Sequence, residues 1–163
     1  MSLNENGYYQ FSYRGNSQKD TECLACMLAS YLTSGDVLFL SGAVGSGKTF
    51  LAGCLIRALG YKGSTPSPTY TIVNRYVVGN SIIFHIDAYR IKDIREFMHL
   101  GIEDELDRAI LIIEWGNKCD EYFTDYIEVN LSFLEEYSKR TVRLLAMGSR
   151  YVDIVNSLEY RVM

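Results

Sequence analysis

The sequence has little of several features that would point to particular classes of protein. It holds two prolines and one tryptophan, and its formal net charge is −4. No apolar run reaches the roughly 18 residues that a membrane-spanning helix needs. The polar start, Met1–Asn6, lacks the apolar segment of a secretory signal. We therefore expect a cytoplasmic protein without a membrane segment.

The acidic charge balance also limits the expected partners. Proteins bind bare nucleic acids mainly through lysine and arginine side chains on phosphates. A chain with 16 basic and 20 acidic residues is poorly suited to hold DNA or RNA tightly by itself. Contact with a nucleic acid is expected only indirectly, through a partner, or through a local basic patch.

The four cysteines do not form a recognisable metal or disulfide framework. Cys23 and Cys26 make a CxxC, but no second CxxC and no paired histidines follow. Without a secretory signal, reduced thiols are the expected state. The motif leaves two interpretations open, a redox or zinc site and two small residues on an amphipathic helix, and the second is favoured.

Hydrophobic periodicity predicts an α/β protein with one domain, residues 1–163. Helices are expected at Lys19–Thr33, Lys48–Leu59 and Ser149–Tyr160, with short helices within Lys92–Leu106. Strands are expected at Tyr8–Tyr13 (an edge strand), Val37–Ser41, Tyr70–Val78, Ser81–Asp87, Ala109–Trp115, Tyr126–Leu134 and Arg140–Met147. Gly79-Asn80 is a hairpin signal between two of these strands. Strands alternate with helices early and then follow one another, which favours a mainly parallel sheet with antiparallel additions.

The most informative motif is the segment Gly42-Ala-Val-Gly-Ser-Gly-Lys-Thr49, which fits the phosphate-binding pattern G-x-x-x-x-G-K-[ST]. An apolar strand runs into it and a helix follows, as the motif requires. Glycines let backbone N–H groups turn onto phosphate oxygens, and the helix N-terminus adds a positive end. The expected nucleotide-binding residues of this loop are Gly42, Gly45, Ser46, Gly47, Lys48 and Thr49. Lys48 would reach the β- and γ-phosphates and Thr49 would ligate Mg²⁺, so the fold class expected is a three-layer P-loop NTPase sandwich.

Two acids follow apolar runs and are candidates to complete a metal site. Asp87 ends the run Ile82–Ile86, and Glu114 ends the run Ile110–Ile113. Ligands bind at the carboxyl ends of strands in α/β sheets, so both can serve Mg²⁺, and Glu114 can orient or deprotonate a water. The alternative for each is a carboxylate that caps a helix or pairs with a cation.

Three further residues near these acids are weaker candidates. His85 has the strand parity of Asp87 and can lie near the site or be an ordinary buried histidine. Arg90 can touch phosphate or form an ion pair. Trp115 can pack on the nucleotide or a partner, or belong to the core.

The order of the motifs resembles the TsaE family, also called YjeE. After the loop come Ser67-Pro-Thr-Tyr-Thr71, His85-Ile-Asp-Ala-Tyr-Arg90 and Ile113-Glu-Trp115. The resemblance runs from about Thr21 to about Trp115 and departs from the usual loop G-D-L-G-A-G-K-T at Ala43 and Val44. The combination is much more specific than a phosphate loop alone.

The resemblance implies an ATPase of the bacterial pathway that makes threonylcarbamoyladenosine in tRNA, acting with a TsaB–TsaD complex. It implies ATP and Mg²⁺ as cofactors, Lys48 and Glu114 as catalytic residues, and Thr49, Asp87 and Glu114 as metal ligands. Ser67–Thr71 would be a switch-like segment near the γ-phosphate, with Thr69 and Trp115 contributing to nucleotide binding.

Two other functions remain open. A P-loop kinase for a small molecule would need an arginine-rich lid, and the arginines after Glu114 (Arg140, Arg143, Arg150 and Arg161) are scattered. A nucleotide-gated assembly module would bind ATP without depending on its hydrolysis. The absence of an N-K-x-D guanine signature mildly favours ATP over GTP.

Overall fold

The structure is a computed structural model that describes residues 2–3, 9–15, 17–133 and 140–162. One eight-stranded sheet runs through it in the order β1-β2-β8-β7-β3-β6-β5-β4. The strands are β1 (Ser2–Leu3), β2 (Tyr9–Gly15), β3 (Val37–Gly42), β4 (Val73–Val78), β5 (Ser81–Asp87), β6 (Ala109–Glu114), β7 (Tyr126–Phe133) and β8 (Arg140–Met147).

The predicted α/β class is confirmed by the way these strands pair. The four central strands β5, β6, β3 and β7 are parallel to one another. Antiparallel pairing adds β4 at one side of them and β8, β2 and β1 at the other. β3 and β6 are apolar along most of their length because both faces of the sheet are covered at the centre.

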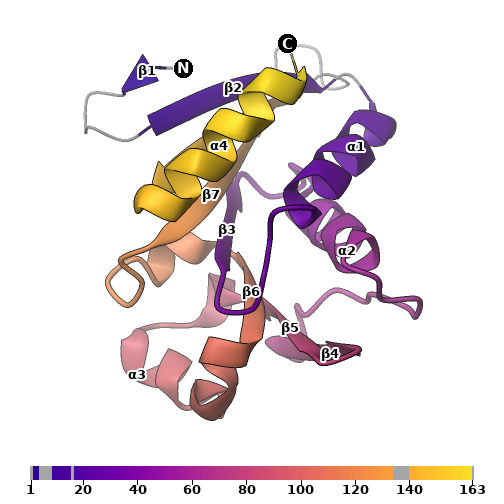
Figure 1. Cartoon of the computed structure of the whole chain (residues 1–163). Helices are drawn as coiled ribbons and strands as arrows, with labels where there is room; N and C mark the ends of the chain where they lie inside the picture. Colours follow the sequence, from indigo (N-terminus) through magenta and orange to yellow (C-terminus); the bar gives the residue numbers. More distant parts are fainter. Residues whose placement is uncertain (1, 4–8, 16, 134–139, 163) are drawn as a thin grey trace.

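Helices on both faces make the sandwich three layers thick. On one face, α1 (Gln18–Ala29), α2 (Lys48–Ala58) and α4 (Ser149–Val162) share a core with residues such as Leu38 and Ile112. The other face carries α3 (Ile94–Met98) and the short 3₁₀ segments η1 (Ala88–Arg90), η2 (Glu103–Arg108) and η3 (Gly116–Lys118). Figure 1 shows α4 running along the β2–β7 half of the sheet, while α1 and α2 lie side by side.

Two sequence expectations need correction or completion. The strand predicted at Tyr8–Tyr13 exists as β2, but it pairs with both β1 and β8 and is therefore not an edge strand. Tyr8, the first residue of that prediction, lies outside the described residues, and so does Leu134, the last residue of the strand predicted at Tyr126–Leu134.

Cys23 and Cys26 lie exposed on α1, and the described part of the chain holds no group of three or more potential metal ligands from His, Cys, Asp and Glu. The helix that the second interpretation of the CxxC expected is present as α1. Among the described residues, no helix combines the length and apolar character needed to cross a membrane.

The C-terminal helix α4 folds against this chain through both apolar and polar contacts. Tyr151 and Val155 are buried in the core, and the Val37 N–H donates to the Tyr151 hydroxyl at 2.9 Å. Arg150 donates to both oxygens of the buried carboxylate of Asp36 at 2.7 Å. These contacts fix α4 to the turn that leads into β3.

This anchor predicts a pH-dependent contribution to stability. Burial works to raise the pKa of Asp36, but hydrogen bonds from Arg150 and the Thr33 N–H outweigh it, so the pKa lies below its usual value. Because the folded-state pKa is depressed, the contribution is full above the unfolded pKa of about 4 and is lost as the pH falls through the folded value. We expect Arg150→Met to lower the free energy of unfolding by about 1 to 3 kcal/mol at pH 7.

Urea titrations at neutral and acidic pH would measure this effect. The difference between wild type and Arg150→Met should shrink as the pH falls below about 4. Arg143→Met is the matched control, because Arg143 lies exposed on β8 and such surface changes stay within about 0.5 kcal/mol. An equal loss of stability in both variants would contradict the assignment of the anchor to Asp36.

Candidate active site

The loop Gly42–Thr49, which the sequence predicts to bind phosphate, lies at the carboxyl end of β3, a strand flanked by the parallel strands β6 and β7. Gly42 has φ 132°, and a Cβ there would lie 2.2 Å from the Leu131 carbonyl oxygen of β7. Gly47 occupies the N-cap of α2 with φ 103°, a conformation that side chains rarely adopt. The two glycines therefore let the chain turn from a central strand into α2 within a few residues, which leaves the helix N-terminus at the loop.

Lys48 lies buried at this turn and is held by the loop itself. Its Nζ donates to the carbonyl oxygens of Gly42 at 2.7 Å and Ala43 at 2.8 Å. The same Nζ lies 4.0 Å from the centroid of the Trp115 ring, a cation–π contact. Burial lowers the pKa of Lys48, and the charges of Glu114 and Asp87 oppose that shift. The ammonium is thus held against the loop carbonyls, in the same cleft as the two carboxylates.

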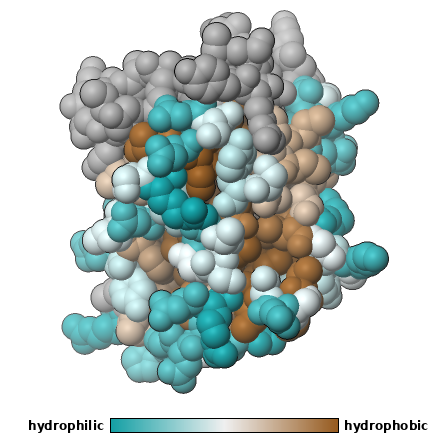
Figure 2. Space-filling model, viewed as in Figure 1, coloured by the Kyte–Doolittle hydropathy of each residue, from teal (hydrophilic) through white to brown (hydrophobic). Residues whose placement is uncertain are grey.

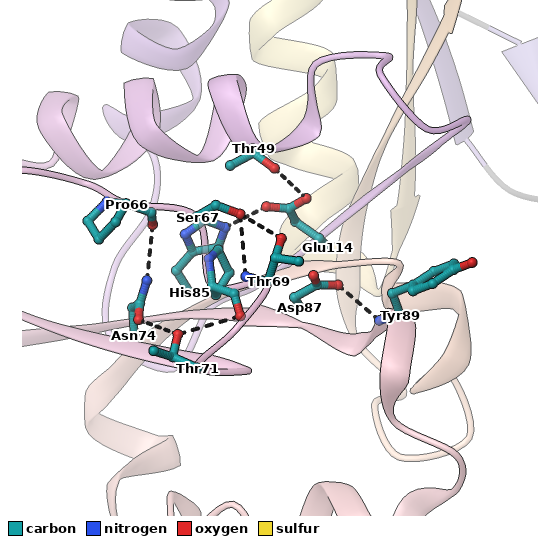
Figure 3. Close-up of polar contacts among 11 residues, drawn as sticks. Thr49, Pro66, Ser67, Thr69, Thr71, Asn74, His85, Asp87, Tyr89 and Glu114 are labelled. Atoms are coloured by element: carbon teal, nitrogen blue, oxygen red, sulfur yellow. Dashed lines mark hydrogen bonds and ion pairs between the residues drawn. The ribbon is translucent and has the colours of Figure 1, made fainter.

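Asp87 and Glu114 lie next to each other at the carboxyl ends of two paired strands. The register of β5 and β6 places them directly opposite, and both are buried. They belong to the strand parity of Ile83 and Ile112, which pack against the α1–α2 face. The Thr49 hydroxyl donates to Glu114 Oε2 at 2.9 Å, so the first turn of α2 is bonded directly to β6 (Figure 3). Asp87 also caps η1, because its Oδ1 accepts the Tyr89 N–H at 3.0 Å.

The three weaker candidates have different environments. His85 is fully buried, and its Nε2 lies 2.8 Å from Glu114 Oε1. Arg90 donates to the carbonyl oxygen of Thr69. Trp115 is partly buried against the hydrophobic core on the α3 face of the sheet. Its φ is 60°, an unusual backbone conformation for a large residue.

The proline-containing segment Ser67–Thr71 forms an irregular turn beside the acids. The Ile72 N–H donates to the Pro68 carbonyl at 2.7 Å, and the Asn74 side chain donates to the Pro66 carbonyl at 3.0 Å. Ile72 has φ 66°, a strained value for a β-branched residue. The Arg90 contact holds the other side of the segment at Thr69. These contacts hold Thr69 at the wall of the site.

The loop, the acids and this segment surround one cleft of about 490 Å³. It is lined by Val44, Gly45, Gly47, Lys48, Thr49, Thr69, Asp87, Tyr89, Glu114 and Trp115. Most of the residues expected from the sequence therefore meet here. Gly42 does not line the cleft, and Ser46 lines a separate hollow of about 110 Å³ next to Leu131 on β7.

Sequence reasoning missed Tyr89 as a lining residue. Tyr89 is 55% exposed, and its ring lies 5.2 Å from that of Trp115. Its position two residues after Asp87, in the turn that follows a strand, is a signal that could have identified it, because such turns build ligand sites in α/β sheets.

A second large cleft, of about 620 Å³, has a different character. It is lined by Ala29, Leu32, Thr33, Ser34, Ala58, Leu59, Val78, Ser81, Ile83 and Ile110, and holds no charged side chain. Figure 2 shows apolar surface in this region, below the position of α2 in Figure 1. It lies at the C-terminal ends of α1 and α2, where helix dipoles disfavour anions. A triphosphate therefore fits the first cleft and not this one.

The donor set of the first cleft fits a magnesium ion bound together with phosphate. Mg²⁺ prefers oxygen ligands and usually takes one or two carboxylates, completing its shell with water and phosphate oxygens. The cleft offers two carboxylates and one hydroxyl. His85 is bonded to Glu114, but the described part of the chain holds no group of three or more His, Cys, Asp or Glu side chains placed to hold a metal ion together, so the set does not form an all-protein metal cage.

Comparisons with known proteins find relatives that share one description. The family model described as "Threonylcarbamoyl adenosine biosynthesis protein TsaE" matches residues 15–142. The tRNA threonylcarbamoyladenosine biosynthesis protein TsaE of Rickettsia felis is 35% identical over 136 residues, 82% of this chain and 79% of that protein. The protein of the same name from Bacillus subtilis is 28% identical over 151 residues, 91% and 94% of the two chains.

A solved structure supports the fold. The crystal structure of YdiB from Bacillus subtilis superposes with a TM-score of 0.79 and covers 94% of this chain and 97% of its own. Since the two sequences are 24% identical in that superposition, the likeness concerns the fold alone.

Proposed function

Since this chain belongs to the TsaE family of threonylcarbamoyladenosine biosynthesis proteins, we propose that it binds and hydrolyses ATP in support of that tRNA modification. Residues 1–163 would act as a single P-loop ATPase domain in the cytoplasm. The observation that carries the proposal is the convergence of Lys48, Thr49, Asp87 and Glu114 on one cleft.

The triphosphate would lie across the loop at the N-terminus of α2. Backbone N–H groups of Gly45, Ser46 and Gly47, together with the helix end, suit phosphate oxygens. Lys48 would move from the Gly42 and Ala43 carbonyls to the β- and γ-phosphates, where a charge-assisted contact is stronger. Trp115 would report this movement, because it is the single tryptophan of the chain and contacts Lys48.

The metal would be held by the hydroxyl of Thr49 and the carboxylates of Asp87 and Glu114. Bound Mg²⁺ would neutralise charge on the phosphates and polarise the γ-phosphoryl group. The chain itself positions these ligands. The Tyr89 N–H holds the Asp87 carboxylate by a hydrogen bond, and the Thr49 hydroxyl donates to the Glu114 carboxylate.

Glu114 would serve hydrolysis by orienting the attacking water. The water oxygen forms a bond to the γ-phosphorus while the bond to the β–γ bridging oxygen breaks, and the proton of the water passes toward the Glu114 carboxylate. The products are ADP and inorganic phosphate. Thr69, fixed by Arg90, would close the cleft on the side of the γ-phosphate.

The partner proposed from the family is a TsaB–TsaD complex, with tRNA contacted only through it. Two exposed side chains that line the cleft support a protein contact there: Val44 is 79% exposed and Tyr89 is 55% exposed. Tyr70, which follows the lining residue Thr69 in the chain, is 91% exposed. Apolar groups of this size favour contact with another protein surface over water. The net charge of −4 also agrees with a protein that does not grip tRNA by itself.

A small-molecule kinase is not favoured by the site. Arg150 is engaged with Asp36 at the start of β3, away from the loop at its carboxyl end. Arg143 lies on β8, two strands away from β3. Neither arginine is placed to close over a γ-phosphate as a kinase lid does.

The direct test measures ATP hydrolysis by the purified chain, alone and with a TsaB–TsaD pair from the same source. We expect slow hydrolysis alone, a clear rise with the pair, and loss of activity when EDTA removes divalent metal. Tight ATP binding with no hydrolysis under either condition would contradict the ATPase proposal. Transfer of the phosphoryl group to a small acceptor, faster than to water, would favour a kinase instead.

A further inference from the structure

The carboxylate of Glu114 is held by two donors that come from different elements of the fold. Thr49 on α2 donates to Oε2 at 2.9 Å. On the other side, Oε1 lies 2.8 Å from Nε2 of His85 on β5. Figure 3 shows the carboxylate between the two side chains. Because a carboxylate oxygen only accepts, Nε2 must carry the hydrogen of this bond.

Among the described residues, Glu114 is the one polar contact of His85. It is 0% exposed, and its Nδ1 has no hydrogen-bond partner in the part of the chain that the structure describes. A buried polar atom without a partner costs free energy of folding. An apolar residue at position 85 would avoid that cost, so stability alone does not account for a histidine here.

The bond from His85 limits the orientations that the Glu114 carboxylate can adopt. The terminal torsion of a glutamate is broad, so a carboxylate without fixed partners samples many orientations. If Thr49 turns its hydroxyl to another partner, Oε1 stays bonded to His85. Oε2, on the side of the loop, is then the oxygen that faces both the metal and the attacking water, and its second lone pair can accept a hydrogen from that water.

We propose that His85 is the positioning residue of Glu114, holding Oε1 so that Oε2 faces the γ-phosphate side of the cleft. This inference rests on the proposed ATP hydrolysis. A base that is itself oriented by a third group is a recurring arrangement in enzymes. His85 touches neither water nor nucleotide in this role and acts through Glu114.

Two substitutions separate positioning from packing. His85→Leu removes the donor, and His85→Gln keeps an N–H at about the position of Nε2. We expect His85→Leu to lower kcat about 10- to 100-fold, the usual cost of losing a supporting contact, with the KM for ATP unchanged. His85→Gln should restore most of the rate. Phe84→Leu is the control, since Phe84 is buried on the opposite face of the same strand.

A measurement without turnover tests the contact itself. The chain has two histidines, so ¹⁵N spectra of their rings can be assigned with the His85→Gln variant. We expect the His85 ring to carry its hydrogen on Nε2 and its resonances to shift in Glu114→Gln. A hydrogen on Nδ1 alone would overturn the proposal.

The kinetic outcomes are also distinct. If wild type hydrolyses ATP and His85→Leu does so at the same rate, the positioning role is wrong while the ATPase proposal stands. If His85→Leu and Phe84→Leu lose the same fraction of kcat, the effect is one of packing and the role is again wrong. If wild type is inert with and without its partner pair, the proposed function fails and the role of His85 fails with it.

Discussion

Replacing Lys48 with methionine should weaken ATP binding by about 10- to 100-fold, because a charge-assisted contact to phosphate is worth roughly 1.5 to 3 kcal/mol. Methionine keeps an unbranched apolar stem at this buried position beside Trp115. The loss would therefore report the charge and not a collapse of the loop. Titration of Trp115 fluorescence with ATP measures the affinity directly, and calorimetry provides a check that does not depend on the tryptophan.

The matched control for this prediction is Lys62→Met. Lys62 is exposed and lies beyond the C-terminal end of α2, whereas Lys48 begins that helix. The substitution changes the net charge by the same amount at a distance of a whole helix from the loop. Wild-type affinity in Lys48→Met, or equal weakening in both variants, would argue against a phosphate-binding role for the loop.

The second large effect is expected for Glu114→Gln. The substitution preserves the shape of the side chain and removes the charge that can orient and accept a proton from water. We expect hydrolysis to fall by about 10²- to 10⁴-fold, while ATP binding is retained, because Lys48 and the loop N–H groups hold the phosphates. Single-turnover measurement of phosphate release, alone and with the TsaB–TsaD pair, separates the chemical step from product release.

Glu128→Gln provides a control for Glu114→Gln. Glu128 lies on β7, which pairs with β3 on the side opposite to β6 and Glu114. Its carboxylate accepts a hydrogen bond from the Ser41 hydroxyl. The control should hydrolyse ATP at the wild-type rate. If Glu114→Gln did so as well, and also supported the tRNA modification, the chain would be a nucleotide-gated assembly module, and hydrolysis would not be its function.

Both predictions concern a cleft whose parts already contact one another. Lys48 is bonded to its own loop and contacts Trp115, and Thr49 is bonded to Glu114. Binding of a triphosphate with its metal would exchange these contacts for stronger ones to phosphate and cation. Val44 and Tyr89 line the same cleft and are exposed, so a partner seated on them would lie next to the contacts that the nucleotide rearranges.

Local features of this site were predictable from the sequence because they depend on neighbouring residues. The loop Gly42–Thr49 is contiguous, and its glycines are needed for a turn that the structure shows at φ 132° and 103°. Asp87 and Glu114 could be recognised because each ends an apolar run, and parallel strands bring such ends to one edge. The hairpin at Gly79-Asn80 and the strands β7 and β8 were also evident from local pattern.

Other features depend on which strands become neighbours, and a single sequence does not encode this in any local pattern. β7 pairs with β3, so that Leu131 crowds Gly42, and β2 is interior because β1 covers it. Asp36 and Arg150 meet across 114 residues of chain. His85 shares its parity with Asp87 in the sequence, but its bond to Glu114 comes from the β5–β6 register. The sequence by itself thus determined the glycine-rich loop Gly42–Thr49 and the acid at the end of each strand, because each of these features is formed by contiguous residues. The tertiary structure alone decided which buried groups hold those acids in place.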